Sequence, residues 1–169
     1  EINGSEFVGV IEAVREANAF TYVGVVERAV SGGSIYCSLV AIDPREGIVG
    51  VHRKLKPTYG ERLVWADGDG AGLVAHEHKG VRLTGLNCWE NWMPLPRAAL
   101  YGQGENLHVA VWPGSDHNTK DITRFIARES RSYVISVSAL MHKENFPEET
   151  PYIEEILSEG PDILANGGS

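Results

Sequence analysis

The chain has 169 residues, 43% of them hydrophobic, which suffices for one domain with a sizeable core and is short for two. Its formal charge of -8, with no lysine-rich run, disfavours nonspecific binding to a phosphate backbone, so we expect no nucleic-acid partner. The two cysteines cannot form a disulfide framework or a four-cysteine zinc site, and no apolar run approaches the roughly 20 residues that span a bilayer, so we expect a cytoplasmic protein without membrane contact.

The first third of the chain predicts a helix followed by three short strands. Apolar residues at helical spacing between positions 7 and 14 indicate the helix. Largely apolar runs at 22–29, 35–42 and 48–52 indicate the strands, and turn residues separate them. Because these connections are short, we expect the strands to pair antiparallel.

The rest of the chain alternates strands with helices after a Gly-rich, irregular stretch at 58–72. Strands are expected at 73–77, 81–86, 107–112 and 133–140, and helices at 93–102 and from a cap at Asn118 or Thr119, with Ile122, Phe125 and Ile126 on one face. The acidic segment 144–161 is expected to be a surface loop with a short helix. This alternation indicates an α/β layered fold in a single domain, residues 1–169.

Cys88 is the first candidate for chemistry, because it lies where an apolar strand meets a helix-forming run. A thiol at such an elbow feels the positive end of the helix dipole, which predicts a poised thiolate. A nucleophilic cysteine also needs a donor for the charge that develops on its substrate. Lys54, at a strand end that opens into a long loop, is the best side-chain donor, and the backbone N–H of Trp89 is the second.

Two motifs resemble the nitrilase, or carbon-nitrogen hydrolase, superfamily. The lysine segment is HRKLKPT at 52–58, followed by Glu61-Arg62, Trp65 and Gly68-Asp69-Gly70; the cysteine segment is CWEN at 88–91, followed by Met93-Pro94-Leu95. Trp directly after Cys, with Glu and Asn behind it, resembles the true nitrilase branch. The similarity extends over nearly the whole chain from Tyr22 onward.

The resemblance implies a four-layer αββα sandwich and a Glu-Lys-Cys catalytic set, with no cofactor and no metal. Cys88 would attack a nitrile carbon and Lys54 would stabilise the tetrahedral species, while Glu61 matches a further glutamate that orients the lysine or relays a proton. A thioimidate and then a thioester lead to the carboxylic acid and ammonia. Members of the family pair into dimers and often extend into spirals. The resemblance therefore implies a homo-oligomer, which can take the form of a spiral.

The sequence departs from the family pattern in one respect. The general-base glutamate of the family lies upstream of the helix at 7–18, and no residue here corresponds to it. We therefore expect an incomplete nitrilase domain, lacking its opening segment and its tail. Since a missing general base commonly costs on the order of 10² to 10⁴ in rate, we expect little nitrile turnover by these residues alone.

Other functions stay open at this point. An amidase or cyanide hydratase of the same superfamily shares the motifs, and a noncatalytic assembly fragment is consistent with the absent glutamate. Trp89 and Trp92 could line a substrate pocket or pack the elbow, and Glu90 could form a supporting hydrogen bond or favour the first helical turn. Cys37 is expected to be a small core residue. His76 and His78 share a strand face, where a solvent-facing pair is favoured over a metal site.

Overall fold

An antiparallel sheet of three strands forms the first half of the fold. The computed structural model describes residue 2 and residues 4–169. Helix α1 (Glu6–Ala17) precedes strands β1 (Thr21–Arg28), β2 (Ile35–Asp43) and β3 (Gly47–Arg53), which pair in that order. The predicted helix, the three strands and their antiparallel pairing are confirmed.

The second sheet holds four strands, in the order β4-β5-β6-β7. Its members are β4 (His76–His78), β5 (Val81–Asn87), β6 (Leu107–Trp112) and β7 (Tyr133–Ser138). The pair β4 and β5 is antiparallel, whereas β5, β6 and β7 are parallel and are joined through α2 (Pro94–Tyr101) and α3 (Asp116–Ser130). Parallel neighbours require such crossover helices, and the carboxyl ends of β5 and β6 therefore meet at one edge.

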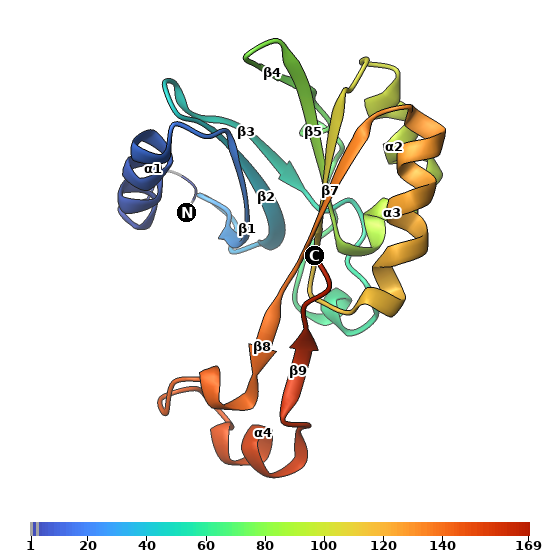
Figure 1. The fold of residues 1–169 in the computed structure, drawn as a ribbon. Coiled ribbons are helices and arrows are strands. Elements are labelled where there is room, and N and C mark those ends of the chain that lie inside the picture. The colour runs from blue at the N-terminus through green and yellow to red at the C-terminus, as the bar shows by residue number, and fades with distance from the viewer. Residues whose placement is uncertain (1, 3) are drawn as a thin grey trace.

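The C-terminal residues form an arm that projects from the body (Figure 1). Strand β8 (Leu140–His142) continues the direction of β7 and pairs antiparallel with β9 (Ile163–Asn166). Between them lie a short 3-10 helix (Lys143–Asn145) and α4 (Ile153–Glu159), so the predicted surface loop with one short helix is confirmed in outline.

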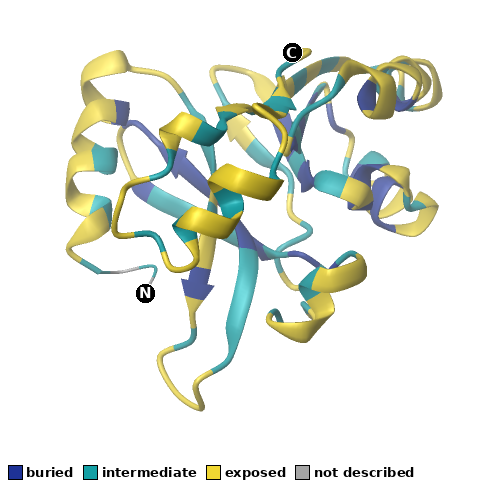
Figure 2. Cartoon of the chain, turned by 90° about the horizontal axis from the view of Figure 1, so that it is seen from below, coloured by how far each residue is buried: buried dark blue, intermediate teal, exposed yellow. Residues whose placement is uncertain are grey.

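The helices lie outside the two sheets, which face one another. Helix α1 packs on the three-stranded sheet, with Val14 in one cluster with Val40 and Ile42 of β2, while Ile122 and Ile126 of α3 pack on β6 (Figure 1). A Cβ at Gly85 of β5 would lie 2.8 Å from Leu39 Cδ2 of β2, so a larger residue there would displace the Leu39 side chain where the two sheets approach. Buried residues concentrate in the strands and the inward sides of the helices (Figure 2).

Some predicted boundaries are wrong. Strand β4 begins only at His76, because Leu73 and Val74 close tight turns to Gly70 and Gly72 instead of pairing with β5. Helix α3 begins at Asp116, with Ser115 as its N-cap at a φ of 92°. The predicted cap at Asn118 or Thr119 is therefore three or four residues too late, because a backbone turn at Ser115, without a side-chain cap, starts the helix.

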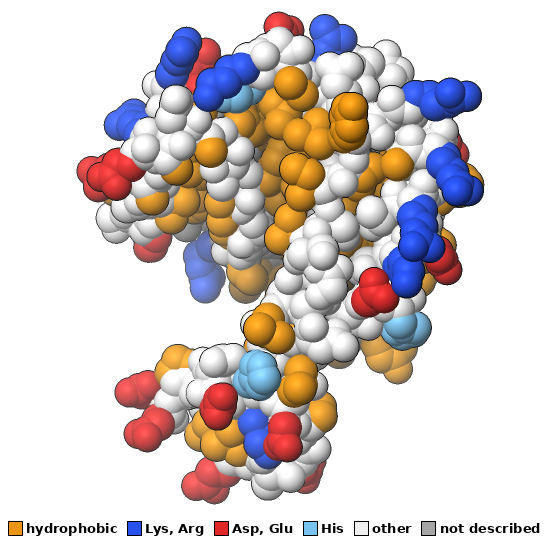
Figure 3. All heavy atoms as spheres, viewed as in Figure 1, with side chains coloured by type: hydrophobic (Ala, Val, Ile, Leu, Met, Phe, Trp, Pro, Cys, Tyr) orange, Lys and Arg blue, Asp and Glu red, His pale blue; other side chains and the backbone are white. Residues whose placement is uncertain are grey.

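Apolar side chains remain on the surface of the second sheet. Tyr133, Ile135 and Val137 alternate along β7 and are exposed by 82, 49 and 44%. Figure 3 shows apolar side chains gathered across this side of the body. Phe125, expected on the buried face of α3, is also half exposed. Within the described residues, none of the helices is both long and apolar enough to cross a membrane.

Candidate active site

The backbone of Lys54 is clamped between two segments at the end of β3. Its N–H donates to the Cys37 carbonyl at 2.8 Å, and its own carbonyl accepts from the Gly68 N–H at 2.9 Å. A Cβ at Gly68 would lie 2.2 Å from the Arg53 carbonyl oxygen, so glycine is required for this loop to reach β3. The Gly-rich loop therefore packs against β3 and fixes where Lys54 points.

The Lys54 side chain is a buried cation with one close carboxylate partner. It is 1% exposed, and its Nζ donates to Glu61 Oε2 at 2.5 Å. The same carboxylate oxygen accepts the Thr58 N–H at 2.5 Å, which holds Glu61 in the first turn of a 3-10 helix (Tyr59–Leu63). A buried ammonium is costly without a paired anion, so this contact accounts for its position.

Cys88 follows β5 directly and begins a 3-10 helix (Cys88–Trp92). Its φ is 57°, in the left-handed region that a residue with a Cβ seldom adopts. Lys54 and the Trp89 backbone N–H both lower the pKa of the thiol. Cys88, Lys54 and Glu61 line one cavity of about 420 Å³, so the structure brings the three predicted catalytic side chains together.

The pKa of Cys88 differs from the expectation. Burial raises the pKa of the thiol, and the lowering effects of Lys54 and of the Trp89 N–H offset only part of it. The predicted thiolate at a helix dipole is therefore wrong for this chain. Cys88 starts a single 3-10 turn, and α2 begins only at Pro94, which has no N–H to donate.

Glu90 joins the cysteine elbow to the lysine strand. Its fully buried carboxylate lies 3.0 Å from His52 Nε2 and accepts the backbone N–H groups of Leu55 at 2.6 Å and Asn87 at 3.3 Å. Of the two roles considered for Glu90, the geometry matches the supporting hydrogen bond. The sequence does not predict that His52 and Leu55 contact Glu90. The one signal for these contacts is that both residues lie within two positions of Lys54 in the lysine segment.

The two tryptophans of the elbow pack against each other. The rings of Trp89 and Trp92 stack at 5.7 Å between centroids and are 49 and 37% exposed. Neither ring lines the cavity that holds Cys88. The Trp89 backbone N–H lowers the pKa of the Cys88 thiol, and its role as a second donor stays a prediction, while its side chain stacks on Trp92.

The prediction that Cys37 is a small core residue is wrong. It is half-buried and lines the same cavity as Cys88, and its Sγ accepts Asn87 Nδ2 at 2.8 Å. Burial raises the pKa of the Cys37 thiol to about 11, so it is neutral at ordinary pH.

The histidine pair of β4 is half-buried and not solvent-facing. His78 Nδ1 lies 2.9 Å from Asp43 Oδ2, and His76 packs against Gly50. Over the residues that the structure describes, no group of three or more His, Cys, Asp or Glu side chains is placed to hold a metal ion.

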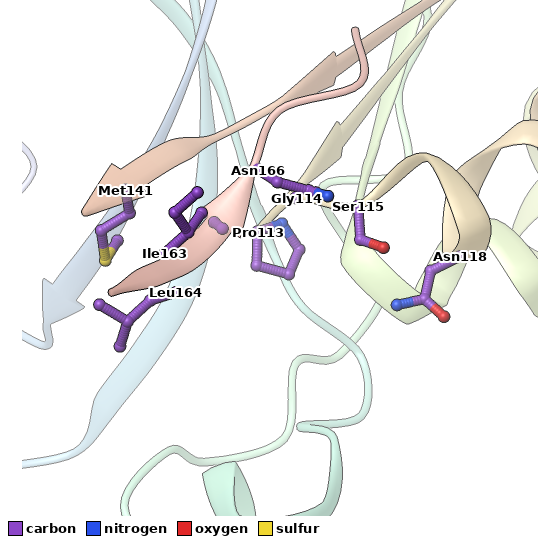
Figure 4. Close-up of a pocket in the computed structure, with 9 residues that line it drawn as sticks. Pro113, Gly114, Ser115, Asn118, Met141, Ile163, Leu164 and Asn166 are labelled. Carbon is purple, nitrogen blue, oxygen red and sulfur yellow. The ribbon is translucent and has the colours of Figure 1, made fainter. Parts of the chain in front are cut away.

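A second cavity of about 650 Å³ lies beside the arm (Figure 4). It is lined by Ile163, Leu164 and Asn166 of β9 and by Ser115 and Asn118 at the start of α3. Pro113 and Met141 line both this cavity and the one around Cys88. The two cavities therefore adjoin at the base of the arm.

Comparison with known proteins identifies the family. Residues 1–144 match the model of the carbon-nitrogen hydrolase family. An aliphatic nitrilase of Sinorhizobium fredii (strain HH103) is 36% identical over 168 residues, covering 99% of this chain and 53% of that protein, and a nitrilase 2 of an unknown prokaryotic organism is 41% identical over 141 residues, covering 82 and 45%. The chain thus spans about half the length of the curated relatives it matches.

Solved structures agree on the fold. A CN-hydrolase superfamily protein from Xanthomonas campestris, whose structure holds an arsenic adduct in the active site, aligns with a TM-score of 0.69 at 18% identity, covering 84% of this chain and 56% of that one. At this identity the likeness establishes the mixed α/β fold alone. Together with the match of the family model over residues 1–144, it shows that the chain belongs to the carbon-nitrogen hydrolase family of enzymes, with nitrilases as close relatives.

Proposed function

We propose that this chain carries the nucleophile of a nitrile-hydrolysing site, with Cys88 as nucleophile and Lys54 as the group that stabilises developing negative charge. The observation that carries the proposal is the single cavity that holds the Cys88 thiol, the buried Lys54 ammonium and the Glu61 carboxylate. The aliphatic nitrilase and the arylacetonitrilase among its relatives support a small nitrile as substrate.

The proposed chemistry starts from a neutral thiol. The Cys88 sulfur bonds to the nitrile carbon, one carbon–nitrogen π bond breaks, and the thiol proton ends on nitrogen, which gives a thioimidate. Water then adds to that carbon and ammonia leaves, and the resulting thioester is hydrolysed to the carboxylic acid, which regenerates the thiol. Lys54 and the Trp89 N–H stabilise charge on the former nitrile nitrogen and later on oxygen.

Glu61 is assigned a positioning role. Among the carboxylates that the structure describes, it is the one that lines the cavity, but it accepts hydrogen bonds from Lys54 and the Thr58 N–H through the same oxygen. A carboxylate held in this way orients the ammonium and is poorly placed to take the thiol proton. We therefore assign the general base to a group other than Glu61, and we propose a four-layer αββα sandwich that assembles as a homo-oligomer.

The test uses an electron-poor aromatic nitrile, such as a cyanopyridine, with the chain as it exists. We expect an added mass equal to that of the whole nitrile, located on Cys88 by peptide mapping and absent from Cys88→Ala. Cys37 serves as the internal control, since it lies in the same cavity with a neutral thiol. An adduct on Cys37 with Cys88 unmodified would overturn the proposal.

Turnover tests the assignment of the base. The residues described here should form the adduct and release product far more slowly than roughly 1 per second, a rate ordinary for enzymes. Release at that rate would show that a group within this chain serves as base. Release of amide in place of acid would move the activity to a nitrile hydratase.

A further inference from the structure

Asn91 bridges the backbone on both sides of the cysteine elbow. Its side chain is fully buried, and its Nδ2 donates to the Leu86 carbonyl at 3.2 Å and to the Cys88 carbonyl at 3.0 Å. Its backbone carbonyl accepts from Arg97 at 3.0 Å. One amide therefore fixes the direction of the peptide units before and after the turn.

His108 of β6 fixes Asn91 in turn. Because Asn91 Nδ2 faces two carbonyl oxygens, its Oδ1 must be the atom that faces His108 Nε2, at 2.9 Å, and so the ring donates there. The imidazole is fully buried, and its Nδ1 lies 3.2 Å from Glu105 Oε2 and 3.1 Å from Thr84 Oγ1. Each ring nitrogen thus has an oxygen partner, which holds the ring in one orientation.

Glu105 anchors the far end of this chain of hydrogen bonds. It is 7% exposed, it accepts from Thr84 Oγ1, and its Oε1 accepts from Ser132 Oγ at 3.2 Å. Burial on its own raises the pKa of the Glu105 carboxyl, but hydrogen bonding and the charge of His108 outweigh it and hold the pKa below its usual range. The anchor is therefore an ionised carboxylate.

We propose that Asn91 and His108 are positioning residues that hold Cys88 in its left-handed conformation, with its thiol directed at Lys54 and the Trp89 N–H. A non-glycine residue at a φ of 57° persists only where its surroundings fix it, and Asn91 bonds the carbonyl of that very residue. The inference rests on the proposed role of Cys88 as nucleophile. It adds that the geometry of the thiol is set from β6, through side chains that touch no substrate.

A merely structural role for the same residues predicts a different result. If the hydrogen bonds only satisfied buried polar groups, their loss would lower stability and leave the thiol as it is. If they position Cys88, their loss would withdraw the thiol from the two donors that lower its pKa. The pH profile of Cys88 alkylation separates the two roles and needs no nitrile turnover.

The experiment measures iodoacetamide alkylation of Cys88 from pH 6 to 10 by peptide mass spectrometry. His108→Leu removes the donor to Asn91, whereas His108→Gln keeps an N–H at the place of Nε2. Ile126→Ala is the matched control, since Ile126 is fully buried under β6 and lies in an apolar cluster outside the chain of hydrogen bonds. Alkylation of Cys37, whose thiol has a pKa of about 11, reports any global unfolding.

We expect His108→Leu to move the Cys88 profile to higher pH and to slow alkylation at pH 8 roughly tenfold, within the range for residues coupled through one hydrogen-bond network. His108→Gln should restore most of the rate, and Ile126→Ala should leave the profile in place. A Cys88 profile in folded His108→Leu that matches the parent would overturn the inference. If His108→Leu does not fold, Thr84→Val against Thr84→Ser is judged by the same criterion.

A nitrile adduct is measured separately on the same variants. An adduct on Cys88 of the parent chain together with an unchanged alkylation profile in His108→Leu would refute the positioning role alone. A shifted profile without any nitrile adduct in the parent would support the positioning role and count against the proposed reaction.

Discussion

Replacing Glu90 by Gln tests whether one buried carboxylate holds the cysteine elbow against the lysine strand. The carboxylate is fully buried, and its two oxygens accept the Leu55 N–H at 2.6 Å and the Asn87 N–H at 3.3 Å, with His52 Nε2 within 3.1 Å of both. A glutamine side chain has the same shape, but one of its two ends donates. Whichever way the amide turns, an NH₂ group then faces a backbone N–H.

The cost follows from that conflict. One hydrogen bond to a charged group is lost and one buried donor is left without an acceptor, which together destabilise by about 2–4 kcal/mol. For a chain of this length that corresponds to a drop in Tm of about 5–15 °C. The measurement is thermal unfolding followed by circular dichroism, combined with urea titration to obtain the free energy of unfolding.

The matched control is Glu77→Gln, the same chemical change at an exposed position of β4. It should alter the free energy of unfolding by no more than about 0.5 kcal/mol. If Glu90→Gln changed the free energy of unfolding as little as Glu77→Gln, the Glu90 carboxylate would not be what holds the cysteine elbow against the lysine strand.

Three further predictions concern titration. Lys54→Met should shift the alkylation profile of Cys88 to higher pH, because the ammonium lowers the pKa of the Cys88 thiol; an unshifted profile would mean that the two groups do not interact in solution. Hydrogen bonding from Arg53 holds the pKa of Glu27 below its ordinary value. Glu27 therefore contributes stability that is present above about pH 4.5 and is lost as the pH falls through its folded pKa. Urea titrations at several acidic pH values should show this loss in the parent chain and not in Glu27→Gln. Cys37, with a pKa of about 11, carries roughly 0.1% thiolate at pH 8, so it should stay nearly unmodified by iodoacetamide there, and rapid labelling of Cys37 in the folded chain would contradict its burial.

The elements were predictable where local pattern decides the structure. The antiparallel order of β1, β2 and β3 follows from short turns between apolar runs, and the parallel strands follow from the helices between them. The errors fall where backbone turns override the pattern. Leu73 and Val74 look like the start of a strand, yet their N–H groups bond back to Gly70 and Gly72.

The sequence predicts the motif residues of the candidate site, but it does not predict the buried hydrogen-bond partners that hold them in place. The positions of Cys88 at a strand-to-helix elbow and of Lys54 at a strand end predicted these two residues, and the family resemblance added Glu61. The structure places all three in one cavity, while their catalytic roles stay predictions. The distant partners of Glu90 and Asn91, which are His52, Leu55 and His108, lie 17 to 38 residues away in the sequence. No local periodicity relates such positions, because the contacts exist only once β3, β5 and β6 are side by side.

The four residues of the CWEN motif divide by direction. Cys88 faces the cavity and the Trp89 ring lies on the outside, whereas Glu90 and Asn91 turn inward to two separate buried networks. Three successive side chains of a 3-10 turn point to different sides, and Cys88, with its left-handed φ of 57°, departs from that geometry, so each of the four can serve another partner. Through Glu90 and Asn91, this one turn connects the cysteine elbow to β3 and to β6. Burial raises the pKa of the thiol there, and Glu61 is hydrogen-bonded to Lys54, so the turn supplies geometry and we propose that a further group transfers the proton.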